Sequence, residues 1–170
     1  NIKLNFAEKK IKKILIDQGF YEVINNPFVI ENLNDSITVD NPLDSNRKYL
    51  RTRLKDSLLN NLTFNERRQK DSVKLFEISD LYNNSNEGVF GKRTIGVIAS
   101  GRIDKNYLNF SKKITKNYLE EVLNKFKPEK YLIEEVSRDH INSKSKNKII
   151  YCEFEIDSSF EIDSDFDDLI

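Results

Sequence analysis

The side chains that most often carry out chemistry are few in this 170-residue chain. It has one histidine, His140, and one cysteine, Cys152, so a zinc site of the usual ligand types would need carboxylates at its remaining positions. Its five glycines form neither a P-loop nor a dinucleotide-binding pattern, and we find no Ser/His/Asp arrangement. The residues therefore predict no catalytic, cofactor-binding or metal-binding site.

The single cysteine fits a strand better than a reactive site. Cys152 alternates with Ile150, Phe154 and Ile156, which is the pattern of a small hydrophobe on the buried face of a strand. One cysteine excludes an internal disulfide and is typical of a reducing compartment, so we expect a cytoplasmic location. No apolar run approaches the length of a membrane span, and we expect no membrane partner.

Charge is balanced over the whole chain but unevenly placed. The net charge is zero and the pI about 6.8, which argues against a bulk nucleic-acid binder. The run from Arg47 to Lys70 is basic, however, and Arg67 and Arg68 within it are candidates for RNA phosphate contacts. An ordinary helix with a charged outer face gives the same pattern. The Asp-rich stretch 157–168 could bind a divalent cation, but we interpret it as a solvated acidic edge.

The central stretch, residues 39–82, predicts a turn, a helix and a strand. Asn41-Pro42 ends the preceding segment, because proline offers no N–H and pushes its neighbour into extended geometry. Val73–Ile78 reads as a short strand that ends in a polar loop at residues 83–86. The helix between them is predicted from a leucine stripe, which is formed by Leu50, Leu54, Leu58 and Leu62, with Leu59 beside it.

The N-terminal segment, residues 4–18, predicts a helix that is followed by Gly19, a strand over residues 20–24 and a turn at Pro27. One apolar arc would pack on the domain's own sheet; it contains Leu4, Ala7, Ile11, Ile14 and Leu15. A second apolar group, mixed with Lys9 and Lys13, lies on roughly the opposite side and contains Ile2, Phe6 and Ile16. This second group favours a contact with a partner, although an ordinary surface helix is the alternative.

The remaining segments complete an α+β pattern. We expect a buried strand over residues 94–100, a helix from Ile114 to Phe126 with Ser111 as its N-cap, and strands over 131–136 and 148–156. Residues 1–170 would form one domain with a largely antiparallel sheet flanked by helices. The chain begins at Asn1 and contains no methionine, so we expect it to be a fragment of a longer product.

Several motifs resemble the synthetase-like core of the bacterial phenylalanine–tRNA ligase beta subunit. The matching pieces are NPLDSNRKYLRT, a helix ending in NERR, and VKLFEISDLY. Arg51-Thr52, the Asn65 to Arg68 segment and the Leu75 to Ile78 segment agree with that family, whereas Ser79 stands where the family usually has glycine. Towards the end only FEID is retained, and His140 lacks the proline that follows histidine in the family.

The resemblance also implies a subunit interface. A lysine-rich helix, a glycine, the sequence FYEV and a proline are similar to motif 1 of class II aminoacyl-tRNA synthetases, whose helix and strand pair subunits. The interface residues that the resemblance implies here are Ile2, Phe6, Lys9, Lys13, Ile16 and Pro27.

Catalytic members of that class need an arginine in motif 2 and a glycine-rich turn with a second arginine in motif 3. Asn83 and Asn84 occupy the motif 2 arginine position, and no glycine follows Gly101. The resemblance therefore implies a class II synthetase-like domain without catalysis, which supports an alpha subunit in a heterotetramer of two alpha and two beta chains. That complex would use ATP, Mg²⁺, phenylalanine and tRNA(Phe). A free-standing tRNA- or RNA-binding module and a metal-dependent hydrolase using the acidic tail are the alternatives.

Overall fold

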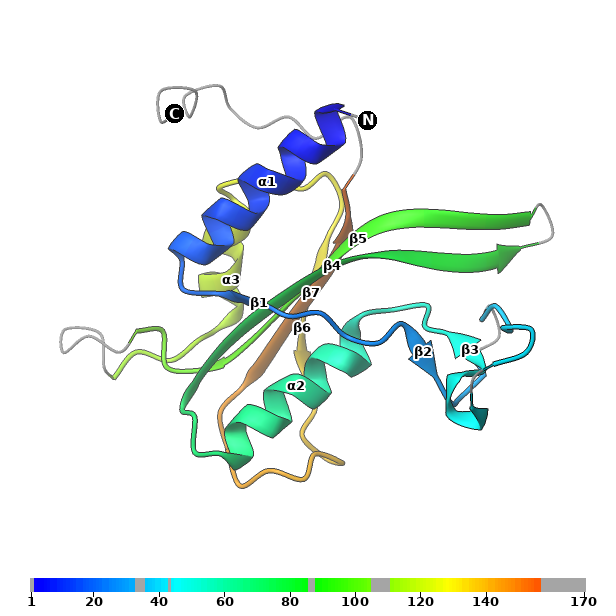
Figure 1. Ribbon diagram of the computed structural model, residues 1–170. Helices are drawn as coiled ribbons and strands as arrows, with labels where there is room; N and C mark the ends of the chain where they lie inside the picture. Colours follow the sequence, from blue (N-terminus) through cyan, green and yellow to red (C-terminus); the bar gives the residue numbers. More distant parts are fainter. Residues whose placement is uncertain (1, 33–35, 43, 86–87, 105–110, 157–170) are drawn as a thin grey trace.

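The computed structural model describes residues 2–32, 36–42, 44–85, 88–104 and 111–156 (Figure 1). Its helices are α1 (Ile2–Asp17), α2 (Lys55–Arg67) and α3 (Lys116–Leu123), with a 3₁₀ turn at Ser45–Arg47. Its strands are β1 (Tyr21–Glu22), β2 (Phe28–Val29), β3 (Tyr49–Leu50), β4 (Ser72–Ser85), β5 (Gly88–Gly101), β6 (Leu132–Val136) and β7 (Ile149–Glu155). No helix of these residues has the length and apolar character that crossing a bilayer requires.

The main sheet has five strands in the order β1-β4-β5-β7-β6, and β2 pairs with β3 in a separate small sheet. Only β1 and β4 run parallel in the main sheet, while the other three pairs are antiparallel. Helices α1 and α3 cover one face of this sheet and α2 covers the other (Figure 1). The predicted α+β class with a largely antiparallel, helix-flanked sheet is confirmed.

Each face of the sheet has its own core. Ile11 and Leu15 of α1 pack with Phe76, Val97 and Cys152 on the α1/α3 face. Alternation along a strand sends successive side chains to opposite faces, so the neighbouring positions supply the second core, beneath α2. The leucines Leu54, Leu58 and Leu62 are fully buried there.

Cys152 is a core residue, as its alternating pattern predicted. It has no exposed surface, and burial raises the pKa of its thiol to about 12. A thiol with so high a pKa stays protonated at neutral pH and is a poor nucleophile.

The strands β4 and β5 are much longer than predicted. They pair in one register from Ser72 opposite Gly101 to Ser85 opposite Gly88, so residues 83–85 continue the strand and are not the polar loop that the sequence suggested. β7 pairs with β5 only from Thr94 to Ser100. The outer part therefore projects from the sheet as a two-stranded ribbon (Figure 1). Backbone pairing between the two strands satisfies the N–H and C=O groups of this polar segment without a buried core, which is why the run of polar residues suggested a loop.

Helix α2 begins about one turn later than the leucine spacing predicts. Leu50 lies in β3, where it pairs with Phe28, and its N–H donates to the carbonyl of Ile37 over 2.9 Å. The helix begins only at Lys55, after Leu54. Four-residue spacing alone does not show where a helix starts, because a strand residue can fall on the same spacing.

The start of the third helix also differs from the prediction. Its N-cap is Thr115, whose side chain accepts a hydrogen bond from the N–H of Tyr118 over 3.3 Å, and not Ser111. The N–H of Ile114 donates to the carbonyl of Gly101 over 2.8 Å, so the residues before Thr115 are held in extended form against the end of β5. Phe126 lies beyond the helix but is buried.

The end of the first helix agrees with the prediction, but the strand after it is shorter. Gly19 has φ +81°, a left-handed conformation that glycine adopts without a steric penalty. The predicted strand over residues 20–24 narrows to Tyr21–Glu22. This edge strand has only β4 as its partner in the described sheet.

Candidate functional site

Helix α1 carries apolar residues on two sides. Ala7, Ile11 and Leu15 on the inner side are buried in the core. Phe6 and Ile16 on the outer side are 52% and 55% exposed. The first arc therefore packs on the sheet as predicted, while these two outer residues meet no other part of the described fold that would bury them.

The other predicted interface residues are distributed along the same helix and beyond it. Lys9 and Lys13 are exposed on α1. Pro27 is exposed beyond β1 and lies close to Tyr82 at the base of the ribbon, where both line a small cavity. The side chain of Ile2 lies outside the described residues.

Exposed apolar side chains continue past α1 into the following segment. Tyr21 is 70% exposed, Ile24 is 92% exposed and Ile30 is 66% exposed. Sequence reasoning missed these three: Tyr21 and Ile24 fell in a strand over residues 20–24 that was expected to be an ordinary member of the sheet, and Ile30 follows β2, which was not expected. Tyr21 and Ile24 lie at or just beyond the short edge strand β1, and Ile30 follows β2 of the small sheet, so their exposure is a tertiary feature.

A network of ion pairs fixes α1 to the sheet. Both carboxylate oxygens of Glu8 accept hydrogen bonds from Arg93 of β5, each over 3.0 Å. Lys12 lies 3.3 Å from Glu8 and 2.8 Å from Glu22 of β1. Hydrogen bonds from Arg93 hold the pKa of Glu8 below its ordinary value, and the Glu22 carboxylate raises the pKa of Lys12. These charged contacts, beside the buried stripe of α1, therefore help to set the orientation of the helix on the sheet.

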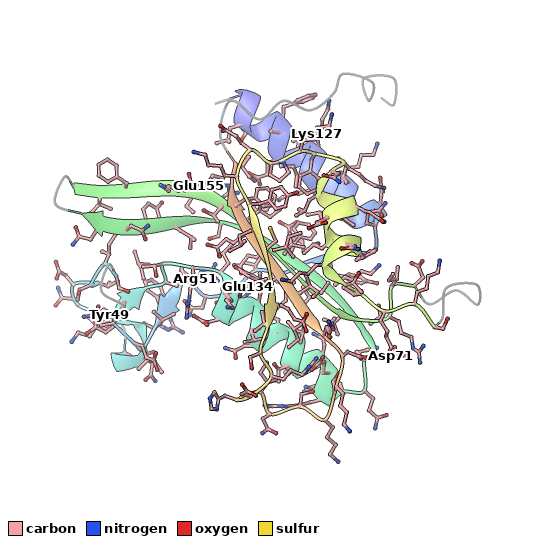
Figure 2. All side chains as sticks on the ribbon, turned by 180° about the vertical axis from the view of Figure 1, so that it is seen from behind. Tyr49, Arg51, Asp71, Lys127, Glu134 and Glu155 are labelled. Atoms are coloured by element: carbon pink, nitrogen blue, oxygen red, sulfur yellow. The ribbon has the colours of Figure 1, made fainter. Side chains whose placement is uncertain are left out.

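Two of the sequence motifs meet in one buried ion pair. Arg51 donates from Nη1 and Nη2 to the two carboxylate oxygens of Glu77, over 3.1 and 2.5 Å. The side chains of both residues are at most 4% exposed. Arg51 lies at the N-terminal end of α2 (Figure 2), and its Nη1 also donates to Ser57 Oγ over 3.0 Å.

The segment after α1 contacts the same carboxylate. The backbone N–H and side-chain amide of Asn25 donate to the oxygens of Glu77 over 3.1 and 2.8 Å. With Arg51 on the other side, both oxygens of Glu77 have hydrogen-bond partners within the protein. This arrangement holds together the β1 end, the α2 start and β4, and we assign it a structural role.

Arg67 and Arg68, the predicted RNA-contact residues, lie at the C-terminal end of α2 and are exposed. The Nε of Arg67 donates to the carbonyl of Asn142 over 2.8 Å. The guanidinium carbon of Arg68 lies 3.4 Å from the centre of the Phe64 ring, and its Nη1 donates to the Phe64 carbonyl over 3.2 Å.

A cavity of about 520 Å³ lies where the ribbon joins the sheet, near Glu155 (Figure 2). Its charged and amide lining residues are Asn83, Lys92, Glu129, Lys130, Glu153 and Glu155. Asn83 is one of the two residues, with Asn84, at the position that the resemblance assigns to the motif 2 arginine.

Several charged residues of this cavity already have partners within the protein. Lys92 lies 2.6 Å from the carboxylate of Glu155. Glu153 accepts a hydrogen bond from the N–H of Leu54 over 2.9 Å at the start of α2. Carboxylates outnumber lysines in this lining, which is unfavourable for a polyphosphate.

The described residues offer no evident metal centre. Among them, no group of three or more His, Cys, Asp or Glu side chains is placed to hold an ion. The Asp-rich stretch 157–168 lies outside the described residues, so the structure does not test that part of the prediction.

A solved tRNA synthetase structure has a similar fold. The structure of PylSc, a pyrrolysyl tRNA synthetase from Desulfitobacterium hafniense, superposes with a TM-score of 0.57 over 89% of this chain and 66% of that chain. The sequence identity is 14%, so this likeness shows a shared fold and nothing about activity.

Curated relatives match in sequence. The phenylalanine–tRNA ligase beta subunit of Fusobacterium nucleatum is 34% identical over 145 residues, which cover 75% of this chain and 18% of that protein. The same subunit of Buchnera aphidicola subsp. Acyrthosiphon pisum is 37% identical over 76 residues, which cover 41% of this chain and 10% of that protein. The chain thus spans less than a fifth of the length of either relative.

The family model described as "Phenylalanyl tRNA synthetase beta chain CLM domain" matches residues 3–153. This match covers both faces of the sheet, the three helices apart from the first residue of α1, and the Arg51–Glu77 pair. The chain belongs to the family of the phenylalanyl tRNA synthetase beta chain CLM domain.

Proposed function

We propose that this chain is a non-catalytic assembly core within a phenylalanine–tRNA ligase beta subunit. It supports an alpha subunit that attaches phenylalanine to tRNA(Phe) at the expense of ATP and Mg²⁺, in a cytoplasmic complex of two alpha and two beta chains. The observation that carries the proposal is the outer face of α1, where Phe6 and Ile16 are about half exposed beside a fully packed inner face.

An apolar outer face of this kind is best explained by a partner that covers it. Phe6, Ile16, Tyr21 and Ile24 are exposed large hydrophobic residues on α1, on β1 and just beyond β1. Contiguous exposed apolar residues often mark interaction surfaces, and obligate interfaces are larger and more apolar than transient ones. Membership of the beta chain family makes the alpha subunit the expected partner.

The cavity at the base of the ribbon supports a non-catalytic role. Synthetase chemistry develops negative charge on phosphate, and fixed cations must meet that charge. Here Asn83 stands at the position of the expected arginine, and Lys92 is paired with Glu155. The lining thus lacks the arginine that would stabilise the transition state.

The experiment that tests the proposal is the double substitution Phe6→Asp with Ile16→Asp. We expect the chain to remain folded, because both side chains are about half exposed, and we expect co-purification with the alpha subunit to fall. Aminoacylation of tRNA(Phe) should fall in parallel, although neither residue would contact substrate.

A matched control is Leu132→Asp, which changes a 77% exposed apolar residue of β6 at the opposite edge of the sheet. It should leave assembly unchanged. If the double variant assembles as well as the control does, the interface lies elsewhere; if circular dichroism shows that it unfolds, these side chains belong to the domain's own core.

A further inference from the structure

Two basic segments that are far apart in the sequence lie side by side at the C-terminal end of α2. The contact between Arg67 and the carbonyl of Asn142 joins the end of α2 to the loop between β6 and β7 (Figure 1). The α2-end surface, as we call it, consists of the exposed residues Phe64, Arg67, Arg68, Lys70, Lys144 and Lys146.

The single acidic residue within residues 64–70 and 141–147 does not cancel this charge. Glu66 accepts hydrogen bonds from Arg138 over 2.7 and 3.0 Å and from Ser143 over 2.7 Å, and its side chain is 3% exposed. Burial raises the pKa of Glu66, but the bonds from Arg138 and Ser143 outweigh this effect and bring it below its ordinary value. Its charge is therefore compensated inside the protein.

The loop presents its lysines outward in a fixed conformation. The hydroxyl of Ser143 accepts the N–H of Ser145 over 3.2 Å, and the hydroxyl of Ser145 accepts the N–H of Asn147 over 3.2 Å. The serines are half-buried, whereas the intervening Lys144 and Lys146 are exposed. A cationic surface with such internal support needs little ordering when a polyanion binds.

An aromatic ring completes the surface. Phe64 is 54% exposed, and the guanidinium group of Arg68 stacks on it at 3.4 Å. Exposed aromatic rings and guanidinium planes are the groups on which unpaired bases stack in RNA-binding proteins.

We propose that the α2-end surface binds single-stranded RNA, with its lysines and arginines on backbone phosphates and the Phe64–Arg68 pair stacked against an unpaired base. An anionic bilayer would also attract the cations, but one exposed ring offers little apolar area for insertion. The stacked ring and guanidinium thus favour RNA. This inference goes beyond the assembly role, and its test needs no alpha subunit.

The test measures binding of a fluorescein-labelled decamer of uridylate to the full chain by anisotropy, between about 50 and 200 mM KCl. Lys144→Glu with Lys146→Glu should weaken binding and flatten the plot of log affinity against log salt by roughly 0.7 for each lost phosphate contact. Phe64→Leu should weaken binding about 5- to 150-fold, the range of base stacking, and leave the salt slope unchanged.

The matched control is Lys125→Glu with Lys130→Glu, which reverses two exposed lysines outside the α2-end surface. It should change neither the RNA affinity nor the salt slope.

The proposal is overturned if Phe64→Leu binds RNA like the wild type, or if the control pair weakens RNA binding as much as Lys144→Glu with Lys146→Glu does. It is also overturned if phosphatidylserine vesicles bind through Lys144 and Lys146 while the decamer does not. Should a variant lose its circular dichroism signal, Phe64→Met and Lys144→Gln with Lys146→Gln replace it. The two proposals are tested separately. A variant of the α2-end surface that loses RNA binding but assembles normally, or an α1 variant that loses assembly but binds RNA normally, distinguishes this proposal from the assembly role.

Discussion

At the scale of single residues, the Arg51–Glu77 pair is the most constrained polar feature of the described fold. A buried ion pair is costly to desolvate, so it stabilises a fold only when its geometry and remaining hydrogen bonds are good. Here the pair is bidentate, and Asn25 adds two more donors to Glu77. These bonds join three segments that surround the start of α2.

Arg51→Ala should destabilise the chain by roughly 3–5 kcal/mol, because Glu77 would remain buried without its counter-charge. Arg53→Ala is the matched control: Arg53 forms an ion pair with Asp56, but both side chains are about half exposed, and such pairs contribute about 0–1 kcal/mol. Urea denaturation of both variants gives the comparison. Equal losses would mean that the buried pair contributes no more than a surface pair.

The Glu8–Arg93 contact predicts a dependence of stability on pH. The bonds from Arg93 lower the pKa of Glu8 below 4.5 in the folded state. The deprotonated carboxylate therefore stabilises the fold above that pH, and its contribution is lost as the pH falls through the folded-state pKa.

Glu8→Gln should therefore be less stable than the wild type at pH 7, and the difference should shrink as the pH falls below 4.5. The free energy of unfolding of both proteins, measured between about pH 3 and pH 7, shows the trend. Arg93→Met should reduce the same pH dependence, since Arg93 is the main cause of the shift. A difference between wild type and Glu8→Gln that does not change with pH would contradict this origin.

At the scale of elements, α2 and the ribbon show how packing positions the surfaces. Gly96 of β5 lies beneath α2, and a Cβ atom there would come within 2.7 Å of Leu58 Cδ1. The helix can therefore approach the sheet closely, and its leucines fill the core while its charged side faces outward. The outer ribbon lacks such a covering helix, and isolated two-stranded ribbons are marginally stable.

Leu58→Ala should cost roughly 2–5 kcal/mol, because it leaves a cavity in the core beneath α2. Asn60→Ala, an exposed change on the same helix, should stay within about 0.5 kcal/mol. Thermal and chemical unfolding of both variants measure these effects. A loss of less than about half a kilocalorie for Leu58→Ala would show that the stripe is not packed as described.

At the scale of the whole molecule, the chain combines a fold that resembles a pyrrolysyl tRNA synthetase structure with a cavity at the base of the ribbon in which carboxylates outnumber lysines. Its apolar helix face, its cavity and its basic α2-end surface are separate regions of one structure. Assembly and RNA contact can therefore be tested by substitutions in different places.

The proposed non-catalytic role predicts that the chain binds neither ATP nor phenylalanine measurably. The cavity at the base of the ribbon has Asn83 where an arginine is expected, and its carboxylates outnumber its lysines. Isothermal titration calorimetry with Mg²⁺ present is the measurement, with the assembled ligase as positive control. Saturable ATP binding at micromolar affinity would contradict a non-catalytic role.

The amino-acid sequence by itself determined much of the local structure. The apolar spacing of residues 4–18 predicted α1 with one buried and one outward group, and the alternation around Cys152 predicted a buried strand. The sequence motifs also predicted the family to which the chain belongs. These features are local, because the periodicity of side chains along a helix or strand is set by backbone geometry alone.

Only the tertiary structure decided which polar residues meet. Arg51 and Glu77 are 26 residues apart, and Arg67 and Asn142 are 75 apart, so neither contact follows from local spacing. The length of the ribbon, the exposure of Tyr21 and Ile24, and the union of two basic segments were likewise beyond sequence reasoning. Each depends on strand pairing and helix packing, which bring distant segments together and fix where a charged or apolar side chain finally points.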